Sequence, residues 1–311
     1  MGKAIREVYG EALAKYGKDD ERIVALDADL SGSTKSAIFG KACPERFLNV
    51  GIAESNMVGM AAGLASVGKI PFVNTFTVFL TTLGLCAARA FGSYSQLPIK
   101  FAGAYGGMSD AFDGPSHHAL EDIAVMRSLA NMQVFVPCDA VQTEWLVKYA
   151  IDTPKPIYLR LSRDKFKDLY TSETEFAPGK GIVVREGTDI TVIACGLMVG
   201  NAIDAAEELA KEGISVRVVD MFSIKPIDEA LIVRCAEETG AIVSAEEHNI
   251  YGGLGSAVAE VLTKHGCGVT QGFVGVNDCH GECGPYKKLL AKYGLDANAI
   301  ANKVRETLAK K

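Results

Sequence analysis

The sequence is 311 residues long and lacks the marks of several protein classes. It has no block of basic residues: 32 lysines and arginines stand against 38 aspartates and glutamates, which gives a net charge of −6. Because nucleic-acid binders carry a basic patch, we expect no nucleic-acid partner. Charged residues make up 23% of the chain and hydrophobic residues 48%, which excludes a wholly disordered or collagen-like chain. A chain of this length holds about two globular domains.

The sequence also lacks a secretion signal and a membrane span. The first ten residues, MGKAIREVYG, carry charges at Lys3 and Arg6 and have no apolar segment before a small-residue cleavage site. The segment 70–88 has 19 residues without a charge, long enough to cross a bilayer, but it contains a proline, an asparagine and four threonines. That composition favours a buried strand followed by a buried helix. We therefore expect a cytoplasmic protein that makes no contact with a membrane.

Common nucleotide and hydrolase motifs are missing as well. The sequence contains no GxxxxGK[ST] loop, no GxSxG elbow and no HExxH pair. The segment YGGLGSAV (251–258) imitates a dinucleotide-binding loop, but Val258 stands where a third small residue is needed. We interpret this segment as a helix start with close backbone packing.

Eight cysteines are scattered along the chain, and without a secretion signal we expect reduced thiols. The closest pair is Cys279 and Cys283, with His280 between them. A zinc site would need a second pair of ligands at a suitable spacing, and the sequence offers none. We interpret this segment as an ordinary loop and predict no metal site in the chain.

Strand-like apolar runs alternate with helical segments along the chain. The strand candidates are 22–30, 46–51, 70–76, 99–105, 132–138, 156–162, 189–196, 214–222, 241–248 and 269–277, and the helix candidates are 54–67, 81–95, 119–129, 140–152, 199–212, 227–238, 253–265, 285–293 and 296–309. Asp139 is expected to cap the helix at 140–152. Nearly continuous apolar strands indicate parallel sheets that helices cover on both faces.

The polar stretch 164–181, with a proline and two glycines, interrupts this alternation and is typical of an interdomain linker. The prediction is an α/β protein of two domains, each with a mainly parallel sheet covered by helices. We place the domains at 1–165 and 181–311 and the linker at 166–180.

Glu54 directly follows the strand candidate 46–51, at the start of a helix rich in small residues. Because its neighbours Ile52, Ala53 and Met57 are apolar, we expect a partly desolvated carboxyl group that can hold or share a proton near neutral pH. The helix dipole alone also favours a glutamate in a first turn, so the segment by itself leaves a structural role open.

The turn FDGPSHHALED (112–122) carries two adjacent histidines, His117 and His118, before a helix. Loops that follow parallel strands often hold reactive groups, and histidine titrates near neutral pH. The alternative is that Ser116 caps the helix while both histidines face solvent. Three isolated arginines could receive a phosphate, although each taken singly is typical of a surface salt bridge: Arg6, Arg160 and Arg163.

Eight segments in this order closely resemble the C-terminal part of transketolase, the thiamine diphosphate enzyme that moves two-carbon ketol units between sugar phosphates. They are ALDADLSGST (25–34), RFLNVGIAESNMVGMAAGLA (46–65), NTFTVFL (74–80), FDGPSHHALED (112–122), VFVPCDAVQTE (134–144), LRLSRD (159–164), VVDMFSIKPID (218–228) and EEHNIYGGLGSAV (246–258). The resemblance covers essentially the full chain and implies a pyrimidine-binding domain followed by a transketolase C-terminal domain.

A complete transketolase also has an N-terminal domain, which carries a GDG motif and binds the cofactor's diphosphate through a divalent metal ion, expected to be Mg²⁺. The sequence has no GDG motif, and residues 4–17 already resemble the start of the pyrimidine-binding domain. The resemblance therefore implies one subunit of a split transketolase. An N-terminal transketolase subunit would supply diphosphate and metal binding, in a heterotetramer with two copies of each chain.

The resemblance also implies which residues contact thiamine diphosphate. Glu54 is the carboxylate that binds a ring nitrogen of the aminopyrimidine, where a shared proton promotes the imino tautomer that deprotonates the thiazolium carbon. Phe76 and Phe79 match aromatic residues that pack on the pyrimidine, although their spacing of three also suits an ordinary core pair. Asp29 matches a residue near the cofactor.

Substrate-binding residues are implied in the same way. Asp113 and His117 match residues that face the donor sugar's hydroxyls and accompany its proton transfers, and His118 is the less favoured histidine. Tyr105 stands where many relatives have a histidine near the substrate phosphate, which predicts weaker or rearranged phosphate contacts. The residues that match phosphate-binding positions are Arg6, Ser33 and Arg163.

Three alternatives stay open. The beta subunit of a 2-oxo acid dehydrogenase also has a pyrimidine-binding domain followed by a C-terminal domain. The arginine pair, Arg6 and Arg163, and the segment DGPSH (113–117) argue against this alternative. Deoxyxylulose-phosphate synthase is a nearer relative, and the wording of 27–34 and 116–122 favours transketolase over it. A noncatalytic regulatory subunit is expected to lose Glu54 or His117, and both are present. In the second domain we expect dimer contacts and structural residues, including Glu247 and His248.

Overall fold

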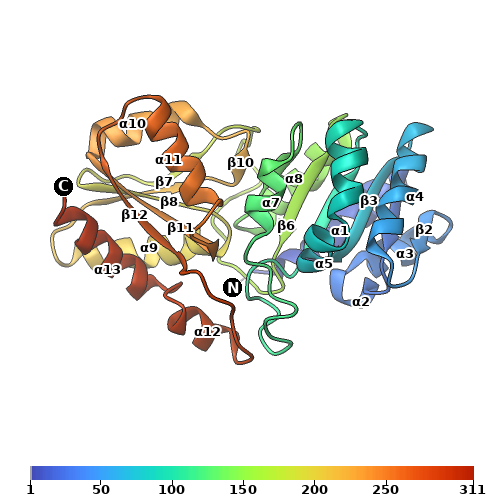
Figure 1. Cartoon of the computed structure of the whole chain (residues 1–311), viewed down its shortest axis with the longest axis horizontal. Coiled ribbons are helices and arrows are strands. Elements are labelled where there is room, and N and C mark those ends of the chain that lie inside the picture. Colours follow the sequence, from blue (N-terminus) through green and yellow to red (C-terminus); the bar gives the residue numbers. More distant parts are fainter. Residues whose placement is uncertain (1) are drawn as a thin grey trace.

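The computed structural model describes residues 2–311, which form two lobes side by side, each built on a β-sheet (Figure 1). The strands of the N-terminal lobe are β1 (Ile23–Asp27), β2 (Phe47–Asn49), β3 (Ile70–Phe76), β4 (Lys100–Ala104), β5 (Gln133–Phe135) and β6 (Ile157–Leu161). Its helices are α1 (Ile5–Asp19), α2 (Ser31–Thr34), α3 (Ser36–Ala42), α4 (Glu54–Ser66), α5 (Thr77–Thr82), α6 (Leu85–Ala87), α7 (Asp122–Ser128) and α8 (Ala140–Asp152), with a 3-10 turn η1 (Pro44–Arg46) and a π-helical segment η2 (Ala88–Tyr94).

The C-terminal lobe follows an irregular segment, 162–181. Its strands are β7 (Ile182–Arg185), β8 (Ile190–Ala194), β9 (Val216–Asp220), β10 (Ser223–Lys225), β11 (Ala241–Asn249) and β12 (Thr270–Val276). Its helices are α9 (Leu197–Ala210), α10 (Glu229–Thr239), α11 (Leu254–Lys264), α12 (Tyr286–Lys292) and α13 (Ala297–Leu308). Helices α10 and α11 lie above this sheet in Figure 1, and α9, α12 and α13 lie below it.

Both sheets are mainly parallel. The first has the order β10-β5-β6-β4-β3-β1-β2, and the second has the order β12-β11-β8-β9-β7. Antiparallel pairing occurs at one edge of each sheet, between β10 and β5 and between β7 and β9. The predicted α/β fold with two helix-covered sheets is confirmed.

Each face of the first sheet has its own hydrophobic core, because successive strand residues point to opposite faces. In β1, Ile23 and Ala25 belong to the core that includes residues of α1, α3 and α8, while Val24 and Leu26 belong to the core on the other face, which includes residues of α4 and α7. The strands β1, β3, β4 and β6 are buried along their whole length. Burial on both faces explains why the sequence shows continuous apolar runs here instead of alternation.

The two lobes share a core and a sheet. Strand β10 belongs to the C-terminal half of the sequence, yet it pairs with β5 of the first sheet. The hydrophobic cluster beneath it joins Met132 and Val136 of one lobe to Ile193 and Met221 of the other. Both halves of the chain therefore contribute strands to the first sheet.

Asp139 caps α8 as predicted and also ties down the segment between the lobes. Its side chain accepts a hydrogen bond from the Gln142 backbone N–H at 2.8 Å. It also accepts hydrogen bonds from the backbone N–H groups of Leu169, at 3.1 Å, and Tyr170, at 2.8 Å. The buried carboxylate thus provides hydrogen-bond acceptors for backbone N–H groups that lie outside any strand or helix.

Two predicted helices were wrong in extent. The segment 81–95 is not one helix: α5 begins earlier, at Thr77, and α6 and the π-helical η2 follow separately. The predicted helix 119–129 begins only at Asp122. The uncharged segment 70–88 divides into β3, α5 and α6, as the expected strand and helix. Among residues 2–311, no helix has both the length and the apolar character that crossing a membrane requires.

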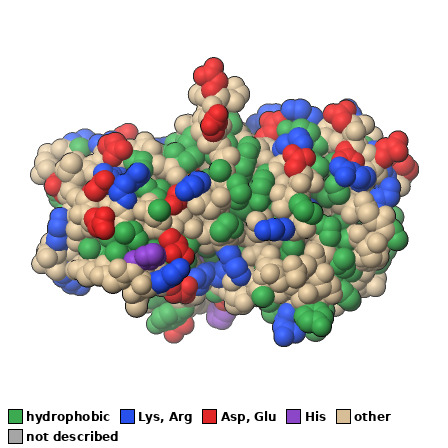
Figure 2. All heavy atoms as spheres, turned by 90° about the horizontal axis from the view of Figure 1, so that it is seen from above, with side chains coloured by type: hydrophobic (Ala, Val, Ile, Leu, Met, Phe, Trp, Pro, Cys, Tyr) green, Lys and Arg blue, Asp and Glu red, His purple; other side chains and the backbone are tan. Residues whose placement is uncertain are grey.

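The surface carries mixed charges. Seen from above, acidic and basic side chains are scattered over both lobes, and hydrophobic side chains gather in a band near the middle (Figure 2). This face shows no large area of a single charge, which agrees with the balance of charges in the sequence.

Candidate active site

The predicted site residues of the first domain gather at one edge of its sheet. Parallel strands end at the same edge, and the loops that follow them converge there. Asp29 follows β1, Glu54 follows β2, Phe76 ends β3, Tyr105 follows β4 and Arg163 follows β6. The topology therefore brings together residues that are far apart in the sequence.

Glu54 is the first residue of α4 and is only 3% exposed, so its predicted desolvation is confirmed. The Thr75 hydroxyl donates a hydrogen bond to its Oε1 at 3.2 Å. This is the only hydrogen bond that the carboxyl group makes among residues 2–311, so its second oxygen remains open to another partner. A buried carboxyl with a spare oxygen is suited to binding a polar ring nitrogen.

An aromatic wall stands at the same edge. The rings of Phe76 and Phe79 are stacked, with centroids 5.9 Å apart and an interplanar angle of 18°. Tyr105 packs on Phe76 at 4.3 Å, and His117 meets Phe79 edge-on at 5.3 Å. Phe76 is buried and Phe79 is half-buried, so the pair still presents part of its surface to a ligand.

Two arginines flank Tyr105. Arg6 donates hydrogen bonds to the Tyr105 hydroxyl and, at 2.7 Å, to the Ser33 backbone carbonyl. The guanidinium carbons of Arg6 and Arg163 lie 4.9 and 5.4 Å from the centre of the Tyr105 ring. The structure thus brings Arg6, Ser33 and Arg163 into one group, with Tyr105 at its centre.

Asp29 and Ser33 lie in the segment from the end of β1 through the short helix α2, which a buried carboxylate organises. Asp27 accepts hydrogen bonds from the Leu30 N–H at 2.6 Å and from the Thr34 and Ser36 hydroxyls at 2.8 and 2.7 Å. Burial raises the pKa of Asp27, and these donors oppose the rise. Asp29 itself is exposed and accepts a hydrogen bond from Asn49 at 2.9 Å.

Two of these residues adopt strained backbone conformations. Asp29 has φ = 65° and Tyr105 has φ = 64°, in the left-handed region that residues other than glycine seldom occupy. Each residue comes just after the end of a central strand. Strain of this kind persists where the surroundings hold it and is concentrated at functional sites.

The two adjacent histidines face different surroundings. His117 is half-buried, touches the aromatic wall, and its Nδ1 lies 2.9 Å from the Ser116 hydroxyl. His118 is buried, and neither of its ring nitrogens has a hydrogen-bond partner among residues 2–311. Burial lowers the pKa of His118. The alternative in which both histidines face solvent is therefore wrong for His118.

Asp110 is a residue of this site that the sequence did not predict. It is 1% exposed, and Arg163 donates a hydrogen bond to its Oδ1 at 3.1 Å. Its Oδ2 is enclosed and has no partner among residues 2–311. Burial and the nearby Asp113 carboxyl raise the pKa of Asp110 to about 7, while Arg163 and Arg6 act to lower it. The one signal in the sequence is an acidic residue at position 110, three residues before the turn DGP (113–115).

The C-terminal lobe holds the loop that carries Asp113 and His117. The Glu247 carboxylate accepts hydrogen bonds from the Met108 backbone N–H at 2.8 Å and from the Tyr286 hydroxyl at 2.9 Å. The Asn249 backbone N–H donates to the Leu120 carbonyl at 2.8 Å. Glu247 therefore has a structural role, as expected. Its hydrogen bond to Met108 and that of Asn249 to Leu120 hold the two ends of the loop 108–120.

Arg160 is not available for a phosphate. It is 6% exposed and forms an ion pair with Asp122, from Nε to Oδ2, at 2.7 Å. It also donates hydrogen bonds to the backbone carbonyls of Ala119, at 3.2 Å, and Glu247, at 2.9 Å. Its role is to link the two lobes, as a buried arginine needs several acceptors.

The two segments that resemble a metal site and a dinucleotide-binding loop are an ordinary loop and the start of a helix. Cys279 and Cys283 are exposed, free thiols in the loop between β12 and α12. The YGGLGSAV segment begins α11, where Glu246 accepts hydrogen bonds from the N–H groups of Leu254 and Gly255 at 2.7 and 2.8 Å. A side chain at Gly253 would collide with Glu246, so the predicted close packing of a helix start is confirmed.

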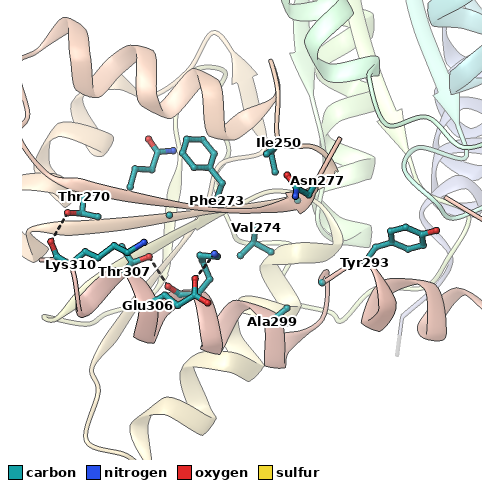
Figure 3. A pocket seen from close by; sticks show the side chains of 15 residues that line it. Ile250, Thr270, Phe273, Val274, Asn277, Tyr293, Ala299, Glu306, Thr307 and Lys310 are labelled. Carbon is teal, nitrogen blue, oxygen red and sulfur yellow. Dashed lines mark hydrogen bonds and ion pairs between the residues drawn. The ribbon is translucent and has the colours of Figure 1, made fainter. Parts of the chain in front are cut away.

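A separate cavity of about 500 Å³ lies in the C-terminal lobe between β12 and α13 (Figure 3). Its lining includes Phe273, Tyr293 and Glu306, and Thr270 bonds to the Lys310 carbonyl at its rim. None of the predicted site residues lines this cavity. The chemistry-bearing groups are concentrated at the edge of the first sheet instead.

Comparisons with known proteins agree with this architecture. Residues 1–168 match the family model described as the transketolase pyrimidine binding domain, and residues 179–300 match the transketolase C-terminal domain. The two lobes are therefore the two domains of this class, and the chain belongs to the transketolase family.

Several relatives match nearly their whole length. A solved structure described as a split gene transketolase, inactive beta4 tetramer, is 48% identical with a TM-score of 0.91, and the match covers 99% of both chains. A Methanocaldococcus jannaschii chain with the provisional name transketolase C-terminal section is 42% identical over 99% of this chain and 97% of its own length. Human transketolase is 40% identical, but this chain spans only 49% of it.

Proposed function

We propose that this chain is the C-terminal subunit of a two-chain, thiamine diphosphate-dependent transketolase that transfers a two-carbon ketol unit from a ketose to an aldose. The observation that carries the proposal is the meeting of Glu54, the Phe76–Phe79 pair and His117 at one sheet edge. Sugar phosphates, which the resemblance predicts, are the first substrates to test. Among the relatives are a 6-deoxy-6-sulfo-D-fructose transketolase subunit from a Clostridium species and an apulose-4-phosphate transketolase subunit from Phocaeicola vulgatus, each 39% identical.

The residues at this edge fit the pyrimidine half of thiamine diphosphate. Glu54 keeps one carboxyl oxygen without a hydrogen bond from residues 2–311, as a partner for a ring nitrogen needs. The half-buried Phe79 beside Phe76 offers an aromatic surface on which a flat ring can pack. When bound, thiamine diphosphate supplies the carbon nucleophile that adds to the substrate carbonyl.

Each residue has a separate task in this proposal. Glu54 holds a proton at the carboxyl oxygen that faces the pyrimidine, in a desolvated position where proton sharing is strong. His117 donates or accepts a proton at the hydroxyl of the bound sugar, and Asp113 orients that sugar by accepting hydrogen bonds. Asp29 borders the cofactor. Arg6, the Ser33 segment and Arg163 receive the far end of the sugar.

The partner subunit is proposed to hold the diphosphate and Mg²⁺. Among residues 2–311, no three His, Cys, Asp or Glu side chains converge as metal ligands, and we derive no step through a metal in this chain. Ile52, two residues before Glu54, is 83% exposed, and Leu83, directly after α5, is 58% exposed. Exposed apolar residues beside a site are typical of an interface, and we propose a heterotetramer with two copies of each chain.

The test is ketol transfer by this chain together with a partner that carries a GDG motif. We expect turnover of D-xylulose 5-phosphate with D-ribose 5-phosphate only when both chains and thiamine diphosphate are present. The Glu54→Gln variant should lose activity roughly 10²- to 10⁴-fold, because it can no longer hold the proton. Glu45→Gln is the matched control, since Glu45 is exposed on the short turn before β2.

Both variants should keep the unfolding midpoint of the unmodified chain to within a few degrees. Full activity of Glu54→Gln would overturn the assignment of Glu54. Complete activity of the chain without a partner would overturn the two-chain proposal.

A further inference from the structure

Two arginines and two carboxyl groups meet at the far end of the proposed sugar site. Arg163 donates a hydrogen bond to Asp110 at 3.1 Å, and Asp113 bonds through its backbone N–H to the Asp110 carbonyl at 3.0 Å. Arg6 completes the group beside Tyr105. The charges of these four side chains sum to zero when both carboxyl groups are ionised.

Two polar atoms of this group lack hydrogen-bond partners. Asp110 Oδ2 and Arg6 Nε are both enclosed, and neither has a hydrogen-bond partner among residues 2–311. Buried polar atoms are almost always paired, so Asp110 Oδ2 needs either a proton shared with the neighbouring Asp113 carboxyl or a donor from a ligand or bound water. A hydroxyl group can donate a hydrogen bond to a carboxylate oxygen such as Asp110 Oδ2, whereas a fully ionised phosphate has no hydrogen to donate and can only accept from the arginines.

We propose that Asp110 is a specificity-determining residue, which makes the site prefer sugars whose terminal group carries at most one negative charge over sugars that end in a phosphate dianion. The proposal rests on the proposed ketol transfer and narrows its substrate class. Arg163 is one of the two arginines proposed to receive a terminal phosphate, and its Nη1 already donates a hydrogen bond to Asp110. A dianion would also approach a carboxylate that is 1% exposed, where water screens repulsion poorly.

Other charged groups around Asp110 do not reverse this effect. Asp113 adds a second negative charge nearby and raises the proton affinity of Asp110. Arg6 already gives hydrogen bonds to Tyr105 and to the Ser33 carbonyl. His117 stands on the aromatic side of the site, against Phe76 and Phe79. The selectivity therefore follows the charge on Asp110, whose pKa of about 7 leaves it ionised at higher pH.

The test compares three ketose donors that differ only at carbon 6: a phosphate, a sulfonate and a hydroxyl group. With the reconstituted two-chain enzyme at pH 8, we expect kcat/KM for the sulfonate or the hydroxyl donor to exceed that for the phosphate donor. Asp110→Asn should shift the ratio toward the phosphate donor by about tenfold, the size of one partly screened charge–charge interaction. The sulfonate and hydroxyl arms show whether one negative charge is tolerated or none.

Two controls separate charge from structure. Asp110→Glu keeps the charge and should keep the ratio of the unmodified enzyme. Asp204→Asn removes the same charge from a partly exposed position on α9, where Asp204 pairs with Lys167, and should leave the ratio unchanged. A ratio that Asp110→Asn leaves within threefold of its original value overturns the proposal. So does an unmodified enzyme that prefers the phosphate donor.

A binding measurement keeps this test independent of catalysis. Sulfate stays a dianion between pH 6 and 8, so its affinity for the full chain, measured by calorimetry, reports on the charge of the site. We expect Asp110→Asn to bind sulfate about tenfold more tightly than the unmodified chain at pH 8, and the gap to narrow at pH 6 as Asp110 takes up a proton. Equal affinities would overturn the role of Asp110. Absent ketol transfer with this affinity gap intact would overturn only the proposed function.

Discussion

His117 and His118 are adjacent in one turn but lie in different surroundings. His117 is half-buried and touches Phe79, whereas His118 is enclosed against Gly281 of the other lobe. His118 has a pKa that burial lowers, so near neutral pH it is an uncharged packing group. The difference in surroundings supports the proposed substrate role of His117 and indicates a packing role for His118.

This contrast predicts separate effects of the two alanine variants. His117→Ala should lower kcat about 10²-fold, since it removes a proton-transfer group, and should leave the unfolding midpoint nearly unchanged. His118→Ala should lower the midpoint, because it opens a cavity between the lobes, and should reduce kcat less. Steady-state kinetics and thermal unfolding of both variants measure this. The reverse ranking of kcat would move the active-site assignment to His118.

The sequence could place Glu54 but not Asp110. Glu54 follows a strand at the edge where parallel strands end, so its position is a local property of the chain. The importance of Asp110 comes from Arg163, which is 53 residues away, and from its burial, and neither is visible in a linear pattern. Arg160 shows the same limit, because its partner Asp122 turns a candidate phosphate ligand into a structural link.

At the scale of elements, the loop 108–120 depends on one carboxyl group from β11. Burial is the main cause that raises the pKa of Glu247 to about 7, from 4.5, although Arg160 and two hydrogen bonds favour its ionised form. Because the folded pKa is the higher one, ionisation of Glu247 costs stability. The cost is absent below about pH 4.5, grows as the pH rises, and is complete above about pH 7.

Glu247→Gln should therefore stabilise the chain at pH 8 but not at pH 4. The amide keeps an oxygen that accepts from Met108 and Tyr286, and it cannot ionise. We expect a gain of roughly 2–3 kcal/mol in the free energy of unfolding at pH 8 and close to none at pH 4, measured by denaturant unfolding. A gain that is equal at both pH values would contradict the linkage.

Glu247→Ala separates the anchor from the charge. It leaves the Met108 N–H and the Tyr286 hydroxyl without their acceptor, at a cost of about 1–3 kcal/mol for each. We expect a lower unfolding midpoint and a higher KM for the donor sugar, because the loop with Asp113 and His117 is held less firmly. Glu247→Gln is the matched control, and its KM should stay near that of the unmodified enzyme.

The elements that the sequence predicted well are those with continuous apolar runs. Strands β3 and β11 were expected at 70–76 and 241–248 and occur at Ile70–Phe76 and Ala241–Asn249. Strand β10 was missed because its three residues, Ser223–Lys225, owe their strand conformation to pairing with β5 across the lobes. The predicted helix 81–95 failed because Gly84 and the π-helical η2 divide it, which the absence of charge does not reveal.

At the scale of the whole molecule, α4 presents an unpartnered face next to Glu54. Gly59 and Gly63 lie one turn apart on it, and a side chain added at either would meet nothing within 4 Å. Met60 is 39% exposed on the same helix, and Tyr94 at the end of η2 is 84% exposed. Small residues between exposed apolar ones allow another backbone to approach closely, so this face is the proposed contact with the partner subunit.

Gly63→Trp should block assembly and leave the fold intact. Gly63 is exposed on α4, and a Cβ added there would meet nothing within 4 Å, so the indole can extend into solvent and the unfolding midpoint should stay within a few degrees of the original. The indole would occupy the space of the partner, which should abolish the two-chain complex in native mass spectrometry and ketol transfer with it. Gly268→Trp, at an exposed site of the other lobe that is equally free of neighbours, is the control and should assemble normally. If Gly63→Trp forms the complex as readily as its control, the partner does not dock on α4, and the exposed apolar residues beside Glu54 must face a different surface of the assembly.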